Sequence, residues 1–488
     1  MKTIASTALP AHVQQPRYDR EQLRSRIVHF GFGAFHRAHQ ALLTNRVLNA
    51  KGGDWGICEI SLFSGDVLMG QLRAQDHLFT VLEKGAEGNQ PIIIGAVKEC
   101  LNAKLDSLAA IIEKFCEPQV AIVSLTITEK GYCIDPATGK LDMRNSRILH
   151  DLEHPSEPHS APGILVEALH RRRERGLPAF TVLSCDNIPD NGHVVKNAVL
   201  GMAGKRSAEL AAWIEAHVSF PGTMVDRIVP AATDASLAEI TQELGVEDPC
   251  AISCEPFIQW VVEDNFVAGR PEWEVAGVQM VEDVLPWEQM KLRMLNGSHS
   301  FLAYLGYLAG YAHINECMQD DSFREAARRL MLNEQAPTLR ITNVDLTAYA
   351  DSLLDRFANP ALQHRTWQIA MDGSQKLPQR MLDGIRVHLE RNTAWPLLAL
   401  GVAGWMRYVS GTDEQGNAID VRDPLSDKFQ AIVATSSDAE RVSALLTLNE
   451  IFGDDLPQNP VFVEAITGAY QRLVRLGAHQ AVIETLKI

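Results

Sequence analysis

The sequence predicts an α/β protein with a doubly wound, mostly parallel sheet followed by a second, mainly α-helical C-terminal domain. Strand-like and helix-like segments alternate through the first half of the chain, which is typical of βαβ units with helices on both faces of a sheet. Beyond about residue 285 the strand pattern ends and helical spacing continues to the end of the chain. We therefore expect a sheet domain over residues 1–285 and a helical domain over residues 286–488.

Length and charge narrow the class of protein. A chain of 488 residues exceeds one typical hydrophobic core, so two domains are expected. The net charge of −16 argues against a nucleic-acid binder, because neutralising phosphates requires clustered cations. The one basic cluster, residues 170–175 (HRRRER), is expected to be a solvated helix C-terminus, where cations complement the helix dipole.

The cysteines and the apolar segments indicate the compartment. Eight cysteines are scattered through apolar segments without a C-x-x-C pair, and no histidine pair at zinc spacing accompanies Cys250 and Cys254. We expect reduced, buried thiols in a cytoplasmic protein without a bound metal. The N-terminus lacks an apolar signal region, and no run of about 18 apolar residues occurs, so neither secretion by that route nor a membrane partner is expected.

The strands and helices of the first half follow from short apolar runs and helical spacing. A loop with three prolines is expected over residues 154–163. Strands are predicted at residues 27–31, 55–63, 120–127 and 180–185, with a further strand ending at 228–230, and helices at 38–48, 67–73 and 105–115.

The second half has helical patterning throughout, interrupted by a polar loop over residues 411–424, and no internal repeat is visible. Helices are predicted at residues 290–308, 323–332, 346–357, 377–390, 395–408, 439–452 and 461–486.

A glycine loop follows the first predicted strand. Gly31-Phe32-Gly33 allows a tight turn and a close approach of backbone N–H groups to a pyrophosphate, although His36 stands where the third glycine of a Rossmann-type fingerprint is usual. This position predicts a Rossmann-type dinucleotide site. Asp66, after the second strand, would hydrogen-bond the adenosine ribose and favour NAD over NADP, or cap a helix, or do both. Glu59, within the second strand, is the other carboxylate that could bind the ribose, or it is merely structural.

A polar set opens the helical half. At about 100° per residue, Asn296 lies roughly 140° and His299 roughly 80° round a helix from Lys291. The apolar surroundings are expected to bury part of Lys291, and burial lowers the pKa of a lysine toward the range that a general base requires. The alternative is a surface lysine, a capping asparagine and a hydrogen-bonded histidine.

Two further segments place polar groups at strand ends. Asn187 follows the strand at 180–185, where doubly wound sheets bind ligands. Asp226 and Arg227 are adjacent in a strand and therefore point to opposite faces, so they do not simply pair with each other. Asp226 is either a site residue or a partner for a basic side chain elsewhere.

Taken together, these segments resemble the polyol-specific long-chain dehydrogenase family, also called the mannitol dehydrogenase family. In its motifs, the chain is most similar to the fructuronate reductase (D-mannonate oxidoreductase) members of this family. The matching stretches cover nearly the whole chain: GFGAFHRAHQ (31–40), SLTITEKGY (124–132), SCDN (184–187), FPGTMVDRIVP (220–230), KLRMLNGSH (291–299) and DGSQKLPQR (372–380).

The resemblance implies NAD-dependent hydride transfer without a metal. By it, Lys291 is the general base, Asn187 and Asn296 hold the reacting oxygen, and His299 orients substrate hydroxyls. Substrate contacts and the proton path are also implied: Asp226, Lys376 and Arg380 for substrate, Glu129 and Glu288 for proton movement.

One departure bears on the substrate. Mannitol-type members have an arginine near the position of Gln368. The overall sequence similarity to fructuronate reductases favours a sugar acid of the D-mannonate/D-fructuronate type as the substrate. Its carboxylate would bind Lys376, Arg380 or Arg365, which are otherwise surface residues. The alternatives are a polyol dehydrogenase acting on a neutral hexitol or pentitol, and a non-catalytic NAD-binding regulator. The sequence does not indicate an oligomeric state.

Overall fold

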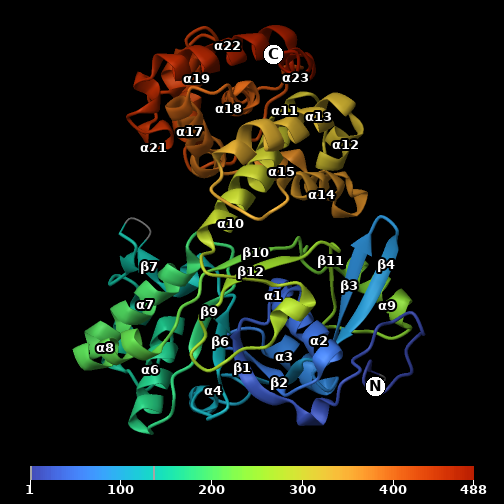
Figure 1. The fold of residues 1–488 in the computed structure, drawn as a ribbon, viewed down its shortest axis with the longest axis vertical. Coiled ribbons are helices and arrows are strands. Elements are labelled where there is room, and N and C mark those ends of the chain that lie inside the picture. The colour runs from blue at the N-terminus through green and yellow to red at the C-terminus, as the bar shows by residue number, and fades with distance from the viewer. Residues whose placement is uncertain (1–2, 136–137) are drawn as a thin grey trace. The chain divides into compact units, whose positions relative to one another are not determined.

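The protein is described by a computed structural model over residues 3–135 and 138–488. The chain forms two compact units, Met1–Leu285 and Pro286–Ile488 (Figure 1). We call them the N-terminal unit and the C-terminal unit.

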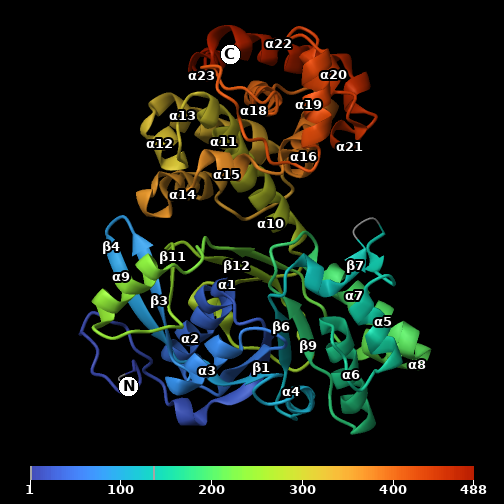
Figure 2. The ribbon, with the colours of Figure 1, turned by 180° about the vertical axis from the view of Figure 1, so that it is seen from behind.

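A five-stranded parallel sheet forms the centre of the N-terminal unit, with the strand order β5-β2-β1-β6-β9. Alternate residues of its central strand pack on opposite faces: Ile27 packs with helix α2, and Val28 packs with helices α4 and α6. The predicted doubly wound, Rossmann-type sheet is thus confirmed, and its layers can be followed from both sides in Figures 1 and 2. The strands are β1 (Arg24–Phe30), β2 (Trp55–Ser61), β5 (Val97–Asn102), β6 (Ile122–Leu125) and β9 (Thr181–Ser184).

The helices of this unit connect and cover the strands. They are α1 (Ala34–Ala38), α2 (Gln40–Lys51), α3 (Asp66–Ala74), α4 (Leu108–Phe115), α5 (Ser146–Glu153), α6 (Ala161–Glu174), α7 (Asn191–Arg206), α8 (Ala208–His217) and α9 (Asp234–Leu244).

Three small sheets were not foreseen, although a strand was expected near β10 of the second one. Their strands are short or pair antiparallel, so they lack the long apolar runs that mark a buried parallel strand. They are β3 (Phe79–Gly85) with β4 (Gly88–Ile94) and β11 (Ile252–Cys254), β10 (Thr223–Asp226) with β12 (Gln259–Glu263) and β13 (Gln279–Val281), and β7 (Ile134–Asp135) with β8 (Lys140–Leu141).

Several predicted boundaries were wrong. The strand expected to end at residues 228–230 ends at Asp226, because the Ile228 N–H donates to the Glu255 carboxylate at 2.6 Å instead of to a strand. The helix expected at residues 38–48 begins at Ala34 and breaks at His39. The expected loop at 154–163 stops early, because the Ser160 hydroxyl caps helix α6.

The basic cluster at residues 170–175 is only partly solvated. Arg172 is fully buried, and its guanidinium donates to the carbonyl oxygens of Phe115 at 2.8 Å and Glu117 at 2.9 Å. The expectation of a solvated helix end was therefore wrong for this residue, whose charge satisfies the backbone at the end of α4. The prediction for the cysteines is confirmed, since all eight are buried and free.

The C-terminal unit is helical around one apolar core. Most of the long predicted helices exist, but two are divided. The pattern over residues 461–486 divides at Gly477, whose φ of +76° ends one helix and begins the next, and the pattern over residues 439–452 forms two short helices, Arg441–Leu445 and Asn449–Phe452. No helix among the described residues is long and apolar enough to span a bilayer. The helices are α10 (Leu285–Met290), α11 (Ser298–Leu308), α12 (Ile314–Gln319), α13 (Asp321–Arg329), α14 (Leu346–Ala358), α15 (Thr366–Ala370), α16 (Gly373–Leu377), α17 (Asp383–Arg391), α18 (Pro396–Tyr408), α19 (Ser426–Thr435), α20 (Arg441–Leu445), α21 (Asn449–Phe452), α22 (Pro460–Leu476) and α23 (Ala478–Thr485).

Candidate active site and nucleotide-binding loop

The glycine loop leaves the carboxyl end of β1, the central strand of the parallel sheet. Gly31 has a φ of +104°, and a Cβ there would collide with the backbone oxygen of Thr126. Gly33 is the N-cap of α1 and makes no side-chain cap, so the backbone N–H groups of the first turn remain available. Phe32 anchors the loop in the core, with its ring edge-on to Phe79 at 5.4 Å. A glycine cradle at this junction fits a dinucleotide pyrophosphate.

The two acidic residues associated with β2 differ in exposure. Asp66 is the first residue of α3 and is partly exposed, with Lys104 Nζ at 2.9 Å; this hydrogen bond lowers the pKa of its carboxyl. The N-cap of that helix is Gly65, so the alternative role of Asp66 as the cap is wrong by one position. Glu59 is fully buried and its carboxylate lies 2.6 Å from His36 Nε2, so it faces the interior.

A buried carboxylate organises the loop that follows β6. Asp186 accepts the N–H groups of Ile127 at 3.0 Å and Thr128 at 2.9 Å, and the Tyr132 hydroxyl at 2.5 Å. Thr128 has a φ of +63°, which these bonds stabilise. The loop leads directly into Glu129, which is exposed. Asp186 thus fixes the backbone that leads into Glu129. This role was not predicted from the sequence, although Asp186 lies in the SCDN stretch.

An asparagine joins the ends of β9 and β10. Asn191 Nδ2 donates to the backbone oxygens of Asp186 at 3.1 Å and Thr223 at 3.0 Å, and Asn191 Oδ1 accepts the Thr223 N–H at 2.9 Å. It therefore ties the segment of Asn187 to the strand that ends at Asp226. Asn187 is exposed, while Asp226 is 6% exposed.

The predicted polar set of the C-terminal unit lies on a π-helical turn. Residues Lys291–Gly297 form π-helix between α10 and α11, so the geometry of an ordinary α-helix assumed from the sequence was wrong. Because a π-helix repeats through i to i+5 hydrogen bonds, Lys291 and Asn296 lie on one face, nearer than the expected 140°. Lys291 is 6% exposed, and Glu288, in the preceding turn, is 8% exposed.

Two other π-helical turns pack against this one. They are residues Leu330–Gln335 and Pro378–Leu382, and Gly297 lies where the three meet. A Cβ at Gly297 would collide with the Gln335 side chain and lie 2.7 Å from the Arg380 backbone oxygen. This glycine therefore allows the close packing that fixes the turn carrying Lys291 and Asn296.

His299 is half-buried among basic side chains. Its ring stacks on Phe357 with centroids 5.0 Å apart, and Nε2 has no hydrogen-bond partner among the described residues. Burial, followed by the charges of neighbouring basic groups, holds the pKa of His299 well below its usual value. We call these neighbours the basic set: His364, Arg380, Arg356 and Lys376.

The cationic side chains predicted to bind a substrate carboxylate differ in the hydrogen bonds that they already make. Lys376 Nζ donates to the backbone oxygens of Met371 at 2.6 Å and Ile369 at 3.3 Å. Arg380 Nη1 donates to Ser300 Oγ at 2.9 Å, while its buried Nε has no partner among the described residues. Arg365 and Gln368 are exposed. Arg380 thus retains unused donor capacity beside His299.

Both units match known proteins. The family models described as the mannitol dehydrogenase Rossmann domain and the mannitol dehydrogenase C-terminal domain match residues 25–275 and 283–474. The chain is 80% identical over 488 residues to an uncharacterized oxidoreductase, YeiQ, of Escherichia coli K12, with both chains fully covered. It is 59% identical over 485 residues to the D-mannonate oxidoreductase of the same organism, covering 99% of each.

A solved structure agrees over the same length. The ternary complex of Pseudomonas fluorescens mannitol 2-dehydrogenase with NAD and D-mannitol superimposes with a TM-score of 0.80 at 42% identity, covering 98% of each chain. The expected resemblance is thus confirmed, and the chain belongs to the mannitol dehydrogenase family of oxidoreductases.

Proposed function

We propose that this NAD-dependent dehydrogenase interconverts a sugar acid and its keto form, of the D-mannonate/D-fructuronate type, with Lys291 as general base and without a metal. The proposal rests on the family, on the identity to a D-mannonate oxidoreductase over almost the whole chain, and on the charge around His299.

The observation that carries the choice of substrate is the basic set. The charges of Arg380, Arg356 and Lys376 act on His299, whereas burial lowers the pKa of His364 to about 4, so this member of the set is neutral near pH 7. In a partly buried site such a field stabilises a carboxylate strongly and gains nothing from a neutral polyol. Arg380 is the carboxylate ligand, because a guanidinium offers several donors in one plane and its Nε is uncommitted. Lys376, whose ammonium already bonds two carbonyl oxygens, supports the field.

When bound, the nicotinamide cofactor would supply the hydride chemistry, and the loop Gly31–Gly33 would hold it. Lys291 takes the hydroxyl proton, while the amide N–H groups of Asn296 and Asn187 stabilise the negative charge that develops on that oxygen. His299 orients neighbouring substrate hydroxyls. We assign Asp226 to substrate binding, and Glu129 and Glu288 to carrying the proton onward to water.

Nucleotide binding belongs to the glycine loop. The backbone of Gly31, Phe32 and Gly33 would hold the pyrophosphate, and the φ of +104° at Gly31, with Thr126 close against it, requires a glycine at the start of this loop. Asp66 would accept hydrogen bonds from the adenosine ribose and repel the additional phosphate of NADP. The partial exposure of Asp66 at the start of α3 suits this role, whereas the complete burial of Glu59 does not.

A neutral hexitol or pentitol remains the second candidate substrate. The specific observation in its favour is the structural agreement with a mannitol 2-dehydrogenase bound to D-mannitol. The exposed Gln368, where the mannitol-type sequences have an arginine, is the observation against it.

Substrate specificity is tested by NADH oxidation with D-fructuronate, D-tagaturonate, D-fructose and D-xylulose in parallel. We expect kcat/KM to be highest for a keto acid, by at least about tenfold, as one charge-assisted hydrogen bond would provide. A preference for either neutral ketose would overturn the sugar-acid assignment and establish the polyol one.

A further inference from the structure

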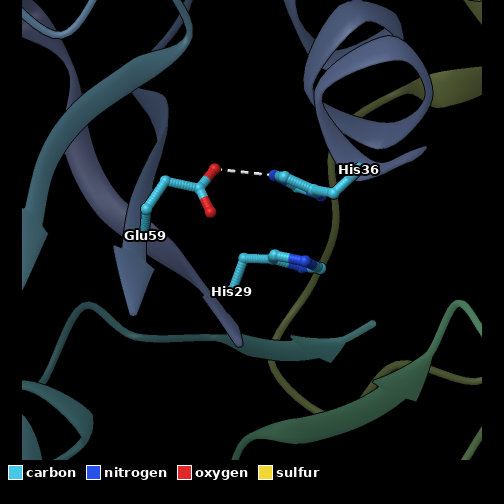
Figure 3. A group of neighbouring side chains, drawn as sticks. All are labelled: His29, His36 and Glu59. Atoms are coloured by element: carbon cyan, nitrogen blue, oxygen red, sulfur yellow. Dashed lines mark hydrogen bonds and ion pairs between the residues drawn. The ribbon is translucent and has the colours of Figure 1, made fainter. Parts of the chain in front are cut away.

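A polar cluster lies buried directly beneath the glycine loop. His29 of β1, His36 of α1 and Glu59 of β2 are at most 1% exposed (Figure 3). Glu59 Oε1 lies 2.6 Å from His36 Nε2, and the rings of His29 and His36 stack with centroids 3.4 Å apart at an angle of 11°. The three side chains come from the three elements that converge on the loop.

The cluster extends to the next strand and to the loop itself. His29 Nδ1 lies 2.7 Å from Ser124 Oγ of β6, and His29 Nε2 lies 2.9 Å from Thr126 Oγ1. The Thr126 hydroxyl also lies 3.1 Å from the Gly31 backbone oxygen, as a donor to it. In the sheet register, His29 is paired with Glu59 on one side and with Ser124 on the other. One connected set of side chains thus joins the carboxyl ends of β2, β1 and β6 to the glycine loop.

These residues have the donor types of a metal site, but their geometry does not suit one. A metal lies in the plane of an imidazole ring, along the lone pair of a nitrogen. The two rings are stacked almost parallel, so their lone pairs do not converge on one point. Both nitrogens of His29 also already lie at hydrogen-bond distance from the hydroxyls of Ser124 and Thr126.

Burying this cluster is unfavourable unless it has a role. Glu59 Oε2 and His36 Nδ1 have no hydrogen-bond partner among the described residues, although both atoms are buried. Unpartnered polar atoms reduce stability, and apolar residues of similar volume would often be more stable there. Directional contacts do, however, fix the orientation of an element more sharply than apolar packing does.

We propose that His36 and Glu59, supported by His29, are positioning residues for the nucleotide-binding loop. His36 occupies the place of the third glycine of the dinucleotide fingerprint, where a small residue usually lets the helix approach the strand. Here the contact between His36 and Glu59 sets the direction of α1 instead. That direction determines where the backbone N–H groups after Gly33 point, and therefore how tightly a pyrophosphate is held.

The charge state of the cluster gives this role a measurable signature. Burial raises the pKa of Glu59 to about 7, against the opposing charge of Arg37. Burial lowers the pKa values of His29 and His36, so both rings are neutral. On the remaining neighbouring strand, burial raises the pKa of the Cys100 thiol to about 11, so it too is neutral.

The sign of the pH effect follows from the negative charge of the dinucleotide. A bound pyrophosphate disfavours a second negative charge beneath the loop, so NADH binding favours the protonated form of Glu59. By linkage, the affinity for NADH decreases as the pH rises through about 7.

The experiment compares Glu59→Gln, Glu59→Leu and His36→Gln with the wild-type protein, measuring the Kd of NADH and the kcat at saturating NADH from about pH 6 to about pH 8. Glu167→Gln is the matched control, since Glu167 is also a buried carboxylate of the same unit, paired with Arg171 at 2.6 Å and remote from the loop.

We expect Glu59→Leu and His36→Gln to raise the Kd of NADH at least about tenfold, with a much smaller fall in kcat, and the control to leave both unchanged. Glu59→Gln keeps a hydrogen-bonding group that cannot titrate, so it should retain binding within about threefold and lose the pH dependence. If Glu59→Leu does not fold, the pH profile of Glu59→Gln still decides.

Three results would overturn the proposal. The first is an unchanged Kd for NADH in folded Glu59→Leu and His36→Gln. The second is a pH dependence of NADH binding that persists in Glu59→Gln. The third is about one equivalent of tightly bound metal per chain in the wild-type protein that is lost in Glu59→Leu, which would make the cluster a metal site after all.

Discussion

The two units hold their functional segments by different means. In the N-terminal unit, the loop Gly31–Gly33 rests on buried, hydrogen-bonded side chains, among them the pair His36 and Glu59. In the C-terminal unit, the turn Lys291–Gly297 is held by close backbone packing of three π-helical turns around Gly297.

The difference corresponds to what each segment presents. A loop that offers backbone N–H groups must have its backbone direction fixed, which directional hydrogen bonds accomplish. A helix that offers side chains needs the right residues on one face, and a change from α to π winding brings residues five apart together. We therefore expect substitutions in the first region to affect nucleotide affinity and substitutions in the second to affect turnover.

The largest effect should come from Lys291→Ala. Loss of the proposed general base is expected to lower kcat about 10³-fold or more while the Kd of NADH stays nearly unchanged, as stopped-flow turnover and fluorescence titration would show. Lys291→Arg is the control for charge, and it should be equally inactive because arginine stays protonated. A parallel loss of NADH affinity would break the division between the units.

The next effect concerns the substrate carboxylate. Arg380→Met should raise the KM for a keto acid about 10- to 100-fold, because one or two charge-assisted hydrogen bonds are lost. Turnover of a neutral ketose, measured in the same assay, should change little. Exposed Arg365 provides the control as Arg365→Met. If Arg380→Met weakens both substrates equally, the residue supports the fold of the turn rather than the charge of the substrate.

Packing of the π-helical turns is tested at Gly297. Gly297→Ala should lower kcat/KM about tenfold and destabilise the unit by about 1–3 kcal/mol, because the added methyl group collides with Gln335 and the backbone near Arg380. Gly468→Ala is a matched control, since a Cβ there meets no atom within 4 Å. Equal behaviour of the two variants would remove close packing as the reason for the turn.

A smaller effect is expected for the choice of cofactor. Asp66→Ala should reduce the preference for NAD over NADP about five- to tenfold, through loss of ribose hydrogen bonds and of repulsion toward the additional phosphate. The measurement is kcat/KM for both cofactors, with Lys104→Ala as the control because Lys104 is the ion-pair partner of Asp66. An unchanged ratio would assign cofactor discrimination to another residue.

The last prediction concerns stability rather than turnover. Each unit holds a buried carboxyl whose pKa burial raises to about 7: Glu59, and Glu334, which accepts the N–H groups of Leu397 at 2.9 Å and Leu398 at 2.7 Å. The unfolded chain loses these protons near its ordinary pKa, so each unit loses stability as the pH rises from about 4.5 to about 7, by up to about 3 kcal/mol per group.

Calorimetry between pH 5 and pH 8 can separate the two carboxyls. Glu59→Gln should flatten the pH dependence of the transition of the N-terminal unit alone, and Glu334→Gln that of the C-terminal unit alone, at about these pH values. A pH dependence unaltered by both substitutions would show that neither carboxyl is protonated in the folded state.

Much of this protein followed from its sequence, because the decisive signals are local. Buried parallel strands such as β6 and β9 are continuous apolar runs, and a glycine loop directly after the first strand predicts a nucleotide site. The spacing of Lys291, Asn296 and His299, together with the family resemblance, was sufficient to select them as site candidates. Side-chain chemistry and short-range periodicity are properties that the chain carries at every position.

Only the tertiary structure decided the features that depend on distant neighbours. The π-helical turn at Lys291–Gly297 exists where two other turns pack against Gly297, and no local pattern of residues marks it. Burial of Arg172 depends on the end of α4, and the role of Asp186 depends on the loop after β6. The pairing of His36 with Glu59 likewise joins residues 23 positions apart, one on helix α1 and the other on strand β2. Such contacts arise from packing between elements, which a single sequence does not encode locally.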